Sequence, residues 1–192
     1  MGNTYSFSEF FKTALSLMLT KITFPQARLI RRPLYARGMK SISGGVGLTT
    51  GRFCRLDLAG SKKTLYIGEN CEMGDMTHIV AHERVEIGNN VLIASKCFIS
   101  DTNHGNYKGV DQDSPSSIPK ERPLSTLPVF IGNNVWLGEN VVVLPGVKIG
   151  DGCIIGANSV VNKCLPGNVI AVGSPARIVK KWNALANEWE PI

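Results

Sequence analysis

The chain has 192 residues, of which 43% are apolar and 19% are charged, and its net charge is +6 at pH 7. These values suit one globular domain. No apolar run approaches the roughly 18 residues of a membrane span, and no secretory signal with a cleavage site is evident, so we expect a cytoplasmic protein.

The first residues are both apolar and basic, and we expect them to form an N-terminal helical segment (residues 1–41). The positions up to residue 40 hold seven Lys or Arg residues and one Glu, which accounts for the whole net charge. The apolar stretch from Phe7 to Ile22 predicts a helix that either caps the domain or packs in an oligomer, or else lies on an anionic membrane. Nucleic acid is not an expected partner, because the basic residues 28–40 include Tyr35 as their one aromatic residue and match no binding motif.

Aliphatic residues recur every six positions through most of the remaining chain, with a two-residue slip around Val85 and Glu86. The anchors of this period are Ile67, Met73, Ile79, Ile87, Ile93, Ile99, Ile131, Leu137, Val143, Ile149, Ile155 and Val161. A helix repeats near 3.6 residues and a strand near 2, so a period of six fits neither alone. It predicts an all-β solenoid over residues 42–174, in which three repeats form one triangular coil and coils stack as parallel strands about 4.8 Å apart.

Compact residues occupy the fourth position after most anchors, where a narrow prism has little room. Three of the five cysteines, Cys71, Cys97 and Cys153, are at this position, so we expect them to pack in the core and to form neither disulfides nor metal sites. His78 and His82 would lie on different parts of one coil, which argues against a shared metal ion. We therefore expect no metal.

The period is interrupted once, between His104 and Val129, by a loop over residues 105–128 that is rich in Ser, Pro and charged residues. A long loop in so regular a framework is usually functional or disordered. His104 stands at the root of the loop, where a cleft can form and where a neutral imidazole can serve as a general base. Asp101 or a backbone carbonyl would hold the other ring nitrogen.

Two features follow the loop. Trp136 departs from the repeat with a bulky outward ring, which either packs against the returning loop or lines a groove. After Val172 the period ends, and residues 175–192 are predicted to form a C-terminal helix that closes the second end of the solenoid.

Several segments together resemble the left-handed β-helix (hexapeptide-repeat) acyltransferases, in the maltose, galactoside and xenobiotic acetyltransferase branch, and most closely the bacterial lipopolysaccharide and capsule O-acetyltransferases. The segments that carry the resemblance are ISDTNHG (99–105), RPL (122–124), VFIGNNVWLGEN (129–140), LPGV (144–147), IGANSVV (155–161) and AVGSPAR (171–177). The resemblance implies a left-handed parallel β-helix and a homotrimer. Its active sites would lie between neighbouring prisms, with acetyl-CoA in the groove between two subunits.

The resemblance also implies roles for single residues. His104 would be the general base that takes the proton of a sugar hydroxyl, which then attacks the thioester directly. Acetyl-CoA would contact Trp136, the backbone N–H of Gly138 as oxyanion donor, Ala157 and Ser159, with Lys163, Arg177 and Lys180 at the nucleotide phosphates. The acceptor would contact Asp75, Asn103, Tyr107 and Arg122.

Three functions remain open at this point. The first is an acetyl-CoA-dependent O-acetyltransferase that modifies a sugar hydroxyl of a bacterial surface polysaccharide or its precursor. The second is acetylation of a small free acceptor, such as an amino sugar or an antibiotic. The third is a non-catalytic or zinc-dependent trimeric solenoid, because the period of six alone does not fix function.

Overall fold

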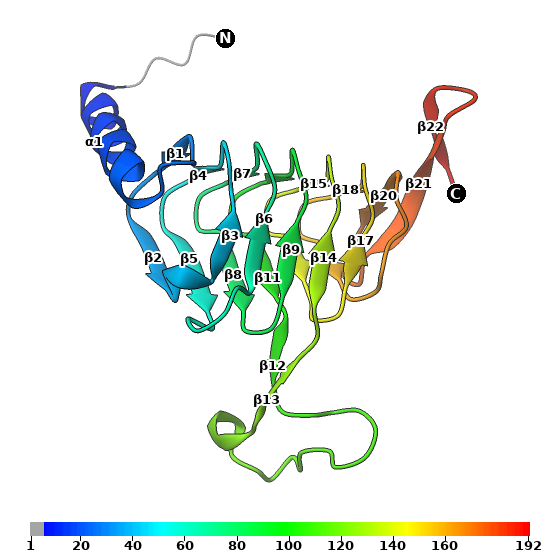
Figure 1. Cartoon of the computed structure of the whole chain (residues 1–192). Coiled ribbons are helices and arrows are strands. Elements are labelled where there is room, and N and C mark those ends of the chain that lie inside the picture. Colours follow the sequence, from blue (N-terminus) through cyan, green and yellow to red (C-terminus); the bar gives the residue numbers. More distant parts are fainter. Residues whose placement is uncertain (1–5) are drawn as a thin grey trace.

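The computed structural model describes residues 6–192, which form a β-solenoid with a helix at one end, a long extruded loop and a β-hairpin at the other end (Figure 1). The chain winds around three flat faces, and strands of successive coils pair in parallel on each face. The left-handed parallel β-helix predicted from the sequence is confirmed.

Each face is one sheet, and two short 3-10 helices lie outside the sheets. In spatial order, the nine-stranded sheet contains β1 (Leu29–Ile30), β4 (Thr49–Thr50), β7 (Glu72–Met73), β10 (Leu92–Ile93), β15 (Trp136–Leu137), β18 (Ile154–Ile155), β20 (Val169–Val172), β21 (Arg177–Asn183) and β22 (Glu188–Pro191). The six-stranded sheet contains β19 (Val160–Val161), β16 (Val142–Val143), β11 (Phe98–Ser100), β8 (His78–Ala81), β5 (Cys54–Leu58) and β2 (Leu34–Arg37). The five-stranded sheet contains β17 (Lys148–Ile149), β14 (Val129–Ile131), β9 (Val85–Ile87), β6 (Leu65–Ile67) and β3 (Ile42–Gly44). The 3-10 helices are η1 (Met39–Ser41) and η2 (Pro119–Glu121).

The solenoid begins earlier than the predicted residue 42. Strand β1 pairs with β4, and β2 pairs with β5, so the first coil starts at Leu29. The anchor positions of this coil hold Ile30, Ala36 and Gly44, so the aliphatic period is weak there and the sequence alone does not indicate where the solenoid begins. Its strands are held by backbone pairing with the second coil.

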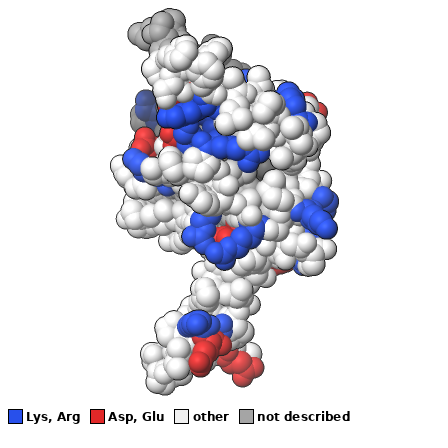
Figure 2. Space-filling view, turned by 90° about the vertical axis from the view of Figure 1, so that its left-hand side faces the viewer, with Lys and Arg blue, Asp and Glu red and all other residues white. Residues whose placement is uncertain are grey.

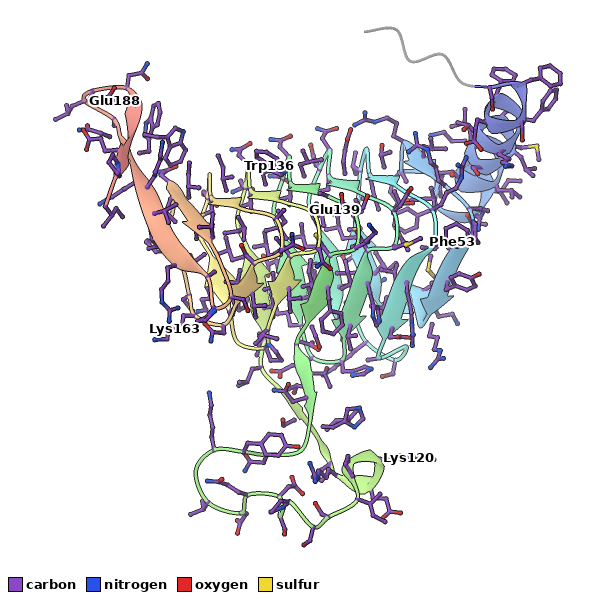
Figure 3. All side chains as sticks on the ribbon, turned by 180° about the vertical axis from the view of Figure 1, so that it is seen from behind. Phe53, Lys120, Trp136, Glu139, Lys163 and Glu188 are labelled. Atoms are coloured by element: carbon purple, nitrogen blue, oxygen red, sulfur yellow. The ribbon has the colours of Figure 1, made fainter. Side chains whose placement is uncertain are left out.

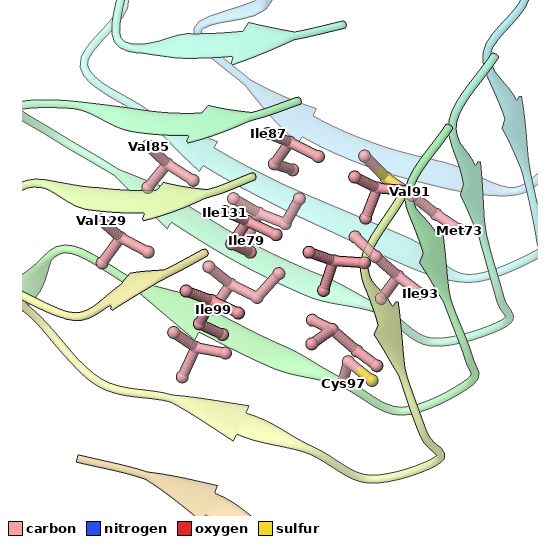
Figure 4. Close-up of a cluster of buried hydrophobic side chains, with 14 of the residues drawn as sticks. Met73, Ile79, Val85, Ile87, Val91, Ile93, Cys97, Ile99, Val129 and Ile131 are labelled. Atoms are coloured by element: carbon pink, nitrogen blue, oxygen red, sulfur yellow. The ribbon is translucent and has the colours of Figure 1, made fainter. Parts of the chain in front are cut away.

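The anchor residues of the period fill the interior, as Figure 4 shows for the middle coils. Ile79, Ile99 and Val143 are 0% exposed and occupy equivalent positions in three successive strands of the six-stranded sheet. Each such side chain stabilises the fold by about 1.5–3 kcal/mol relative to an exposed one. The cysteines Cys71, Cys97 and Cys153 are buried free thiols, as expected.

Asparagines shape many of the corners. Asn70, Asn90, Asn134, Asn140 and Asn158 all have φ between 55° and 60°, in the left-handed region that Asn tolerates better than most residues. Their side chains also stack from coil to coil, since the amide of Asn90 donates to Asn134 at 3.2 Å and that of Asn140 to Asn158 at 2.9 Å. The repeated corner therefore has a local cause in the sequence.

Helix α1 (Phe7–Thr23) packs on the solenoid with its polar face inward. Ser6 caps its first turn, and its two buried residues are Ser16 and Thr20. The Thr20 hydroxyl accepts the backbone N–H of Ile30 at 2.9 Å. Most of the large apolar side chains of the helix are exposed: Phe7, Phe10, Phe11, Leu15, Leu17, Met18 and Ile22. This arrangement is the reverse of an ordinary surface helix. Within residues 6–192, no helix is long and apolar enough to cross a membrane.

The predicted C-terminal helix over residues 175–192 is wrong. Strand β21 pairs antiparallel with β20 and so extends the nine-stranded sheet, and β22 pairs with β21. The Asn183 side chain accepts the backbone N–H groups of Leu185 and Ala186 at 2.9 and 3.1 Å, which stabilises a turn where a helix would need those groups itself. Trp182 and Trp189 then face each other across the hairpin, with ring centroids 5.4 Å apart.

The extruded loop stands on a two-stranded stalk, which the hexapeptide pattern does not indicate. Strands β12 (Thr102–His104) and β13 (Leu124–Thr126) pair antiparallel, with Thr102 opposite Thr126 and His104 opposite Leu124. The stalk leaves the solenoid at the edge between the six-stranded and five-stranded sheets (Figure 1). We call this edge the loop edge.

Candidate active site at the loop edge

His104 ends strand β12, and its side chain is exposed. It lines a pocket of about 390 Å³ between the stalk and the outer surface of the six-stranded sheet. Polar and aromatic side chains converge on the same pocket, among them Arg37, Asp57, His78, His82, Phe98 and Thr102. A concave surface with a few convergent polar groups is the usual form of a small-molecule site.

Asp101 does not hold the ring of His104. Its carboxylate is 0% exposed and accepts the backbone N–H groups of His82, Glu83 and Arg84 at 3.1, 2.8 and 2.8 Å. It also accepts the hydroxyl of Thr102 at 2.6 Å. These bonds fix the corner between β8 and β9 against the first residue of the stalk. The predicted direct contact of Asp101 with the base is therefore corrected: Asp101 positions the strand that carries His104.

The floor of the pocket holds an ion-pair cluster that sequence reasoning missed. Asp57 accepts a hydrogen bond from His78 Nε2 at 3.0 Å and an ion pair from Arg55 at 2.7 Å. Burial opposes ionisation of Asp57, but the bonds from His78 and Arg55 outweigh it and lower the pKa of the carboxyl. The alternation of β5 makes Arg55 and Asp57 outward residues, but only the register with β8, which places Arg55 beside His78, brings the cluster together.

His82 is a second missed residue. Its Nδ1 lies 3.0 Å from the Thr102 hydroxyl, and that hydroxyl donates to Asp101. Because the hydroxyl proton is directed at the carboxylate, His82 Nδ1 carries the proton of its contact with Thr102, which leaves Nε2 free to accept. His82 therefore adds a ring of defined orientation to the pocket of His104.

Two of the four predicted acceptor residues lie together on the loop. The guanidinium of Arg122 donates to the Tyr107 hydroxyl at 2.8 Å and to the Ser117 carbonyl at 2.8 Å. The Tyr107 hydroxyl in turn donates to the backbone carbonyl of His104. Arg122 and Tyr107 thus brace the loop against the stalk next to the base, and Asn103 is exposed beside it.

The fourth, Asp75, lies elsewhere. It follows β7 at the edge between the nine-stranded and six-stranded sheets, and its carboxylate accepts the backbone N–H of Arg52 at 2.7 Å. We call this edge the second edge. Within one chain the structure does not bring Asp75 to the pocket of His104.

The predicted acetyl-CoA residues fall mostly on the second edge and on the nine-stranded sheet. Trp136 is 48% exposed and lies on the side of the solenoid opposite the extruded loop (Figure 3). Gly138 and Ala157 follow β15 and β18 at the second edge. Arg177 and Lys180 are exposed on β21. One chain therefore keeps these residues apart from His104.

Two of these predictions need correction at the level of single atoms. The Gly138 N–H donates to the carbonyl of Ile155 at 2.8 Å, so it is part of the backbone stack and not a free oxyanion donor. Ser159 is 0% exposed, and its hydroxyl accepts the Gly173 N–H at 3.0 Å. Both groups satisfy backbone partners, as groups at a tightly stacked corner must.

Lys163 is the one predicted acetyl-CoA residue on the loop edge. It follows β19, whereas His104 follows β11, and one strand, β16, separates the two in the sheet. With about 4.8 Å per strand, Lys163 lies roughly 10 Å along the solenoid axis from the level of the base. Its exposed ammonium is placed to meet an anionic group of a ligand that runs along this edge.

No group of three or more His, Cys, Asp or Glu side chains that could hold a metal ion occurs in residues 6–192. The arrangement at the loop edge offers instead an exposed imidazole, a polar pocket and a nearby cation. These groups suit proton transfer to and from a bound ligand.

Comparisons with known proteins agree with the fold and identify relatives. A family model described as bacterial transferase hexapeptide (six repeats) matches residues 128–163. The chain is 41% identical over 191 residues to the putative lipopolysaccharide biosynthesis O-acetyl transferase WbbJ of Escherichia coli K12, covering 99% of this chain and 97% of the relative. It is 40% identical over 119 residues to the galactoside O-acetyltransferase of the same organism, covering 62% of this chain and 55% of the relative.

Two solved structures are similar in fold. A galactoside acetyltransferase in complex with coenzyme A has a TM-score of 0.58 and 32% identity, and the match covers 75% of this chain and 67% of that chain. AntD, an N-acyltransferase from Bacillus cereus solved with 3-hydroxybutyryl-CoA, has a TM-score of 0.71 over 97% of this chain and 93% of its own. At 24% identity, AntD is evidence for the fold alone.

Proposed function

The chain belongs to the hexapeptide-repeat acetyltransferase family, and we propose that it transfers the acetyl group of acetyl-CoA to a sugar hydroxyl of a bacterial surface polysaccharide or its precursor. The observation that carries the proposal is the exposed His104 ring in a polar pocket at the loop edge. The relative named for lipopolysaccharide O-acetylation, aligned over nearly the whole chain, supports the acceptor class.

In this proposal His104 is the general base. Its neutral imidazole takes the proton of the sugar hydroxyl as the oxygen attacks the thioester carbonyl, and a tetrahedral intermediate forms. The intermediate collapses when the carbon–sulfur bond breaks, and the imidazolium returns the proton to the coenzyme A sulfur. General base catalysis contributes about 10²–10⁴ in rate. Because the Gly138 N–H is already bonded, another donor must stabilise the oxyanion.

The state of the cysteines supports direct transfer without an acyl-enzyme. Burial raises the pKa of Cys54 to about 11 and also raises the pKa of Cys71, Cys97 and Cys153. A thiol must ionise to act as a nucleophile, so these four are poor acyl carriers. The remaining thiol, Cys164, accepts the Lys148 N–H at 3.3 Å and does not line the His104 pocket.

We place the complete site between subunits of a homotrimer. One chain holds His104 and Lys163 on the loop edge, but holds Ala157 at the second edge and Trp136 on the nine-stranded sheet. A row of outward apolar residues on the nine-stranded sheet, including Leu92 and Trp136, offers surface for a neighbouring chain. Packing one chain's loop edge against the next chain's second edge brings both groups around one acetyl-CoA.

Mixed assemblies test this placement. His104→Ala and Trp136→Ala subunits are each expected to be weakly active alone. When the two are unfolded and refolded together, about a quarter of the sites receive an intact half from each variant, and activity returns to that extent. Mixtures that stay as inactive as the separate variants would place both residues in one chain's site or in none.

The function itself is tested by a donor and acceptor screen. The full chain is incubated with acetyl-CoA and with lipopolysaccharide, capsule fragments and sugar nucleotides, and acetylated products are found by mass spectrometry. We expect an ester on a carbohydrate and stoichiometric release of coenzyme A. Acetylation of an amine only, or of no carbohydrate, would contradict the proposal.

A free galactoside is the second candidate acceptor. It is favoured by the match to the galactoside O-acetyltransferase, both in sequence and in the structure with coenzyme A. The same screen separates the two acceptors, because a small galactoside is then modified faster than any polymer fragment.

The finer proposal on partners and location is that the enzyme acts in the cytoplasm, peripherally at the inner membrane. The outward apolar face of α1 supports it, since exposed apolar patches of this kind mark protein or membrane contacts. A flotation assay with anionic vesicles compares the full chain with Phe11→Gln and with the control Ser8→Gln on the same helix. Equal recovery of wild type and Phe11→Gln would contradict membrane contact.

A further inference from the structure

The N-terminal end of the solenoid holds an apolar pocket that acetyl transfer does not use. Its volume is about 260 Å³, and inward side chains of the first coils line it, among them Ile30, Leu48, Leu56 and Met73. Phe24, just after α1, forms part of its wall. A cavity of about 150 Å³ with a comparable aliphatic lining stays dry and binds benzene. The pocket therefore favours a larger apolar occupant.

Two buried polar groups in this pocket lack partners among the described residues. Thr50 is 4% exposed, and its hydroxyl has no hydrogen-bond partner within residues 6–192. Arg32 donates from Nη2 to the Thr23 hydroxyl at 3.0 Å, whereas its Nε is buried without an acceptor in the described part of the chain. Buried donors are rarely left unpaired. An occupant with hydrogen-bond acceptors at one end would supply the missing partners of both groups.

A basic groove continues from the pocket to the surface. Lys12, Arg32, Leu34 and Arg52 line the groove, and Arg32 and Leu34 also line the apolar pocket. Glu9 pairs with Lys12 at 3.3 Å and with Arg52 at 2.5 Å, whereas no ion pair of Arg32 with a carboxylate occurs within residues 6–192, so the groove keeps a net positive charge. Figure 2 looks onto this end and shows Lys and Arg gathered beneath the helix.

We propose that this end of the solenoid binds an anionic amphiphile, one apolar chain of which fills the pocket while its phosphate or carboxylate is held by Arg32. Guanidinium bonds to such groups are among the stronger hydrogen bonds in proteins. Two sources offer this chemistry: a membrane phospholipid and a phosphorylated polyprenyl carrier. The site lies apart from His104 and does not depend on the proposed acetyl transfer.

Decyl phosphate, below its micellar concentration, is the probe for the full chain in isothermal titration calorimetry. We expect saturable binding with one molecule per subunit. Arg32→Met should lower the affinity at least about tenfold. Arg28→Met is the matched control, because Arg28 pairs with Glu72 at 3.6 Å and lines neither cavity, and it should bind as wild type does. Equal affinities of wild type and Arg32→Met would overturn the assignment of the head group.

The apolar half of the site is tested by filling the pocket. Ala36→Phe places a ring where the chain would lie, and Met39→Trp narrows the pocket at a residue that is 38% exposed and so tolerates a larger ring. Both are expected to abolish binding of decyl phosphate. Inorganic phosphate alone should show no saturable binding. If either variant keeps the melting curve of the wild type and also binds decyl phosphate with wild-type affinity, the proposal is overturned. If Ala36→Phe fails to fold, the affinity of Met39→Trp decides the question.

Vesicles distinguish the two sources. Phosphatidylcholine vesicles are doped with equal fractions of phosphatidylglycerol or of a polyprenyl phosphate. The Ala36→Phe variant has a filled pocket and an unchanged α1, so it measures how much protein α1 alone holds on the vesicles. Pocket-dependent recruitment by phosphatidylglycerol assigns the site to membrane lipid, and recruitment by polyprenyl phosphate alone assigns it to the carrier. Recruitment by neither overturns the proposal. His104→Ala should bind decyl phosphate normally, so a failure of the catalytic proposal leaves this test intact.

Discussion

The middle coils and the two ends of the solenoid bury their apolar residues in different ways. In the middle, Ile99 stacks between Ile79 and Val143, so each anchor has a like neighbour above and below. At the N-terminal end, α1 turns Ser16 and Thr20 toward the coil and leaves an apolar pocket. At the C-terminal end, a hairpin continues one sheet. The repeat determines how the interior of the solenoid packs, whereas the candidate sites lie where the repeat is interrupted or ends.

The largest expected effect on stability is at the interruption. Asp101→Ala removes a buried carboxylate and leaves three backbone N–H groups at the corner without an acceptor. We expect a loss of about 4 kcal/mol in the free energy of unfolding, together with lower acetyl transfer, because the corner carries the stalk. Urea denaturation at fixed protein concentration measures the free energy of unfolding. A loss below about 1 kcal/mol would show that the corner holds without Asp101.

The difference between middle and end is tested by two matched truncations. Ile99→Ala empties a fully enclosed position and should cost about 3 kcal/mol. Ile42→Ala enlarges a pocket that already exists at the N-terminal end, so fewer contacts are lost and the cost should be about half as large. The same denaturation experiment compares them. Equal costs would mean that the end is packed as tightly as the middle.

The pH dependence of stability probes the floor of the His104 pocket. Because the pKa of Asp57 is lowered in the folded protein, its stabilising contribution is present above the ordinary value of 3.8 and is lost as the pH falls through the folded value. Asp57→Asn should therefore lower the melting temperature by about 2–4 °C near neutral pH and by less in acid. Scanning calorimetry from neutral to acid pH measures the difference in melting temperature between the variant and the wild type. A difference that grows toward low pH would have the wrong sign.

The smallest effect is expected at the C-terminal hairpin. Trp182→Ala removes one ring of a cross-strand aromatic pair, which contributes about 0.5–1 kcal/mol beyond the area it buries. Hydrogen exchange should then accelerate in residues 177–191 and not in the middle coils. Faster exchange throughout the solenoid would show that the hairpin and the coils unfold as one unit.

The sequence predicted what the repeat controls and missed what depends on distant partners. The period of six identified the buried anchors, such as Leu137 and Ile155, because each coil repeats the same local geometry. Trp182 was assigned to a helix because its pairing with Trp189 and the edge offered by β20 are tertiary features. The period also could not show that Asp57 meets His78, since that contact depends on the register of a coil without clear anchors.

The same distinction, between features set by the repeat and features set by distant contacts, applies to the residues of the candidate site. His104 was found because it stands at the visible break in the period, and the structure places it at a pocket. Gly138 and Ser159 were assigned from the motif alone, and their polar groups are already bonded within the stack. A motif identifies a corner of the solenoid, whereas the orientation of each group there depends on the coil beside it.

The central claim is that the loop edge carries the chemistry through His104. The most direct test is the kcat/KM for acetyl transfer by His104→Ala, measured beside Lys62→Ala, an exposed residue that lines none of the three cavities discussed above. We predict a loss of about 10²–10⁴ for His104→Ala with unchanged melting temperature, and no loss for Lys62→Ala. An activity of His104→Ala within about tenfold of wild type would contradict the account.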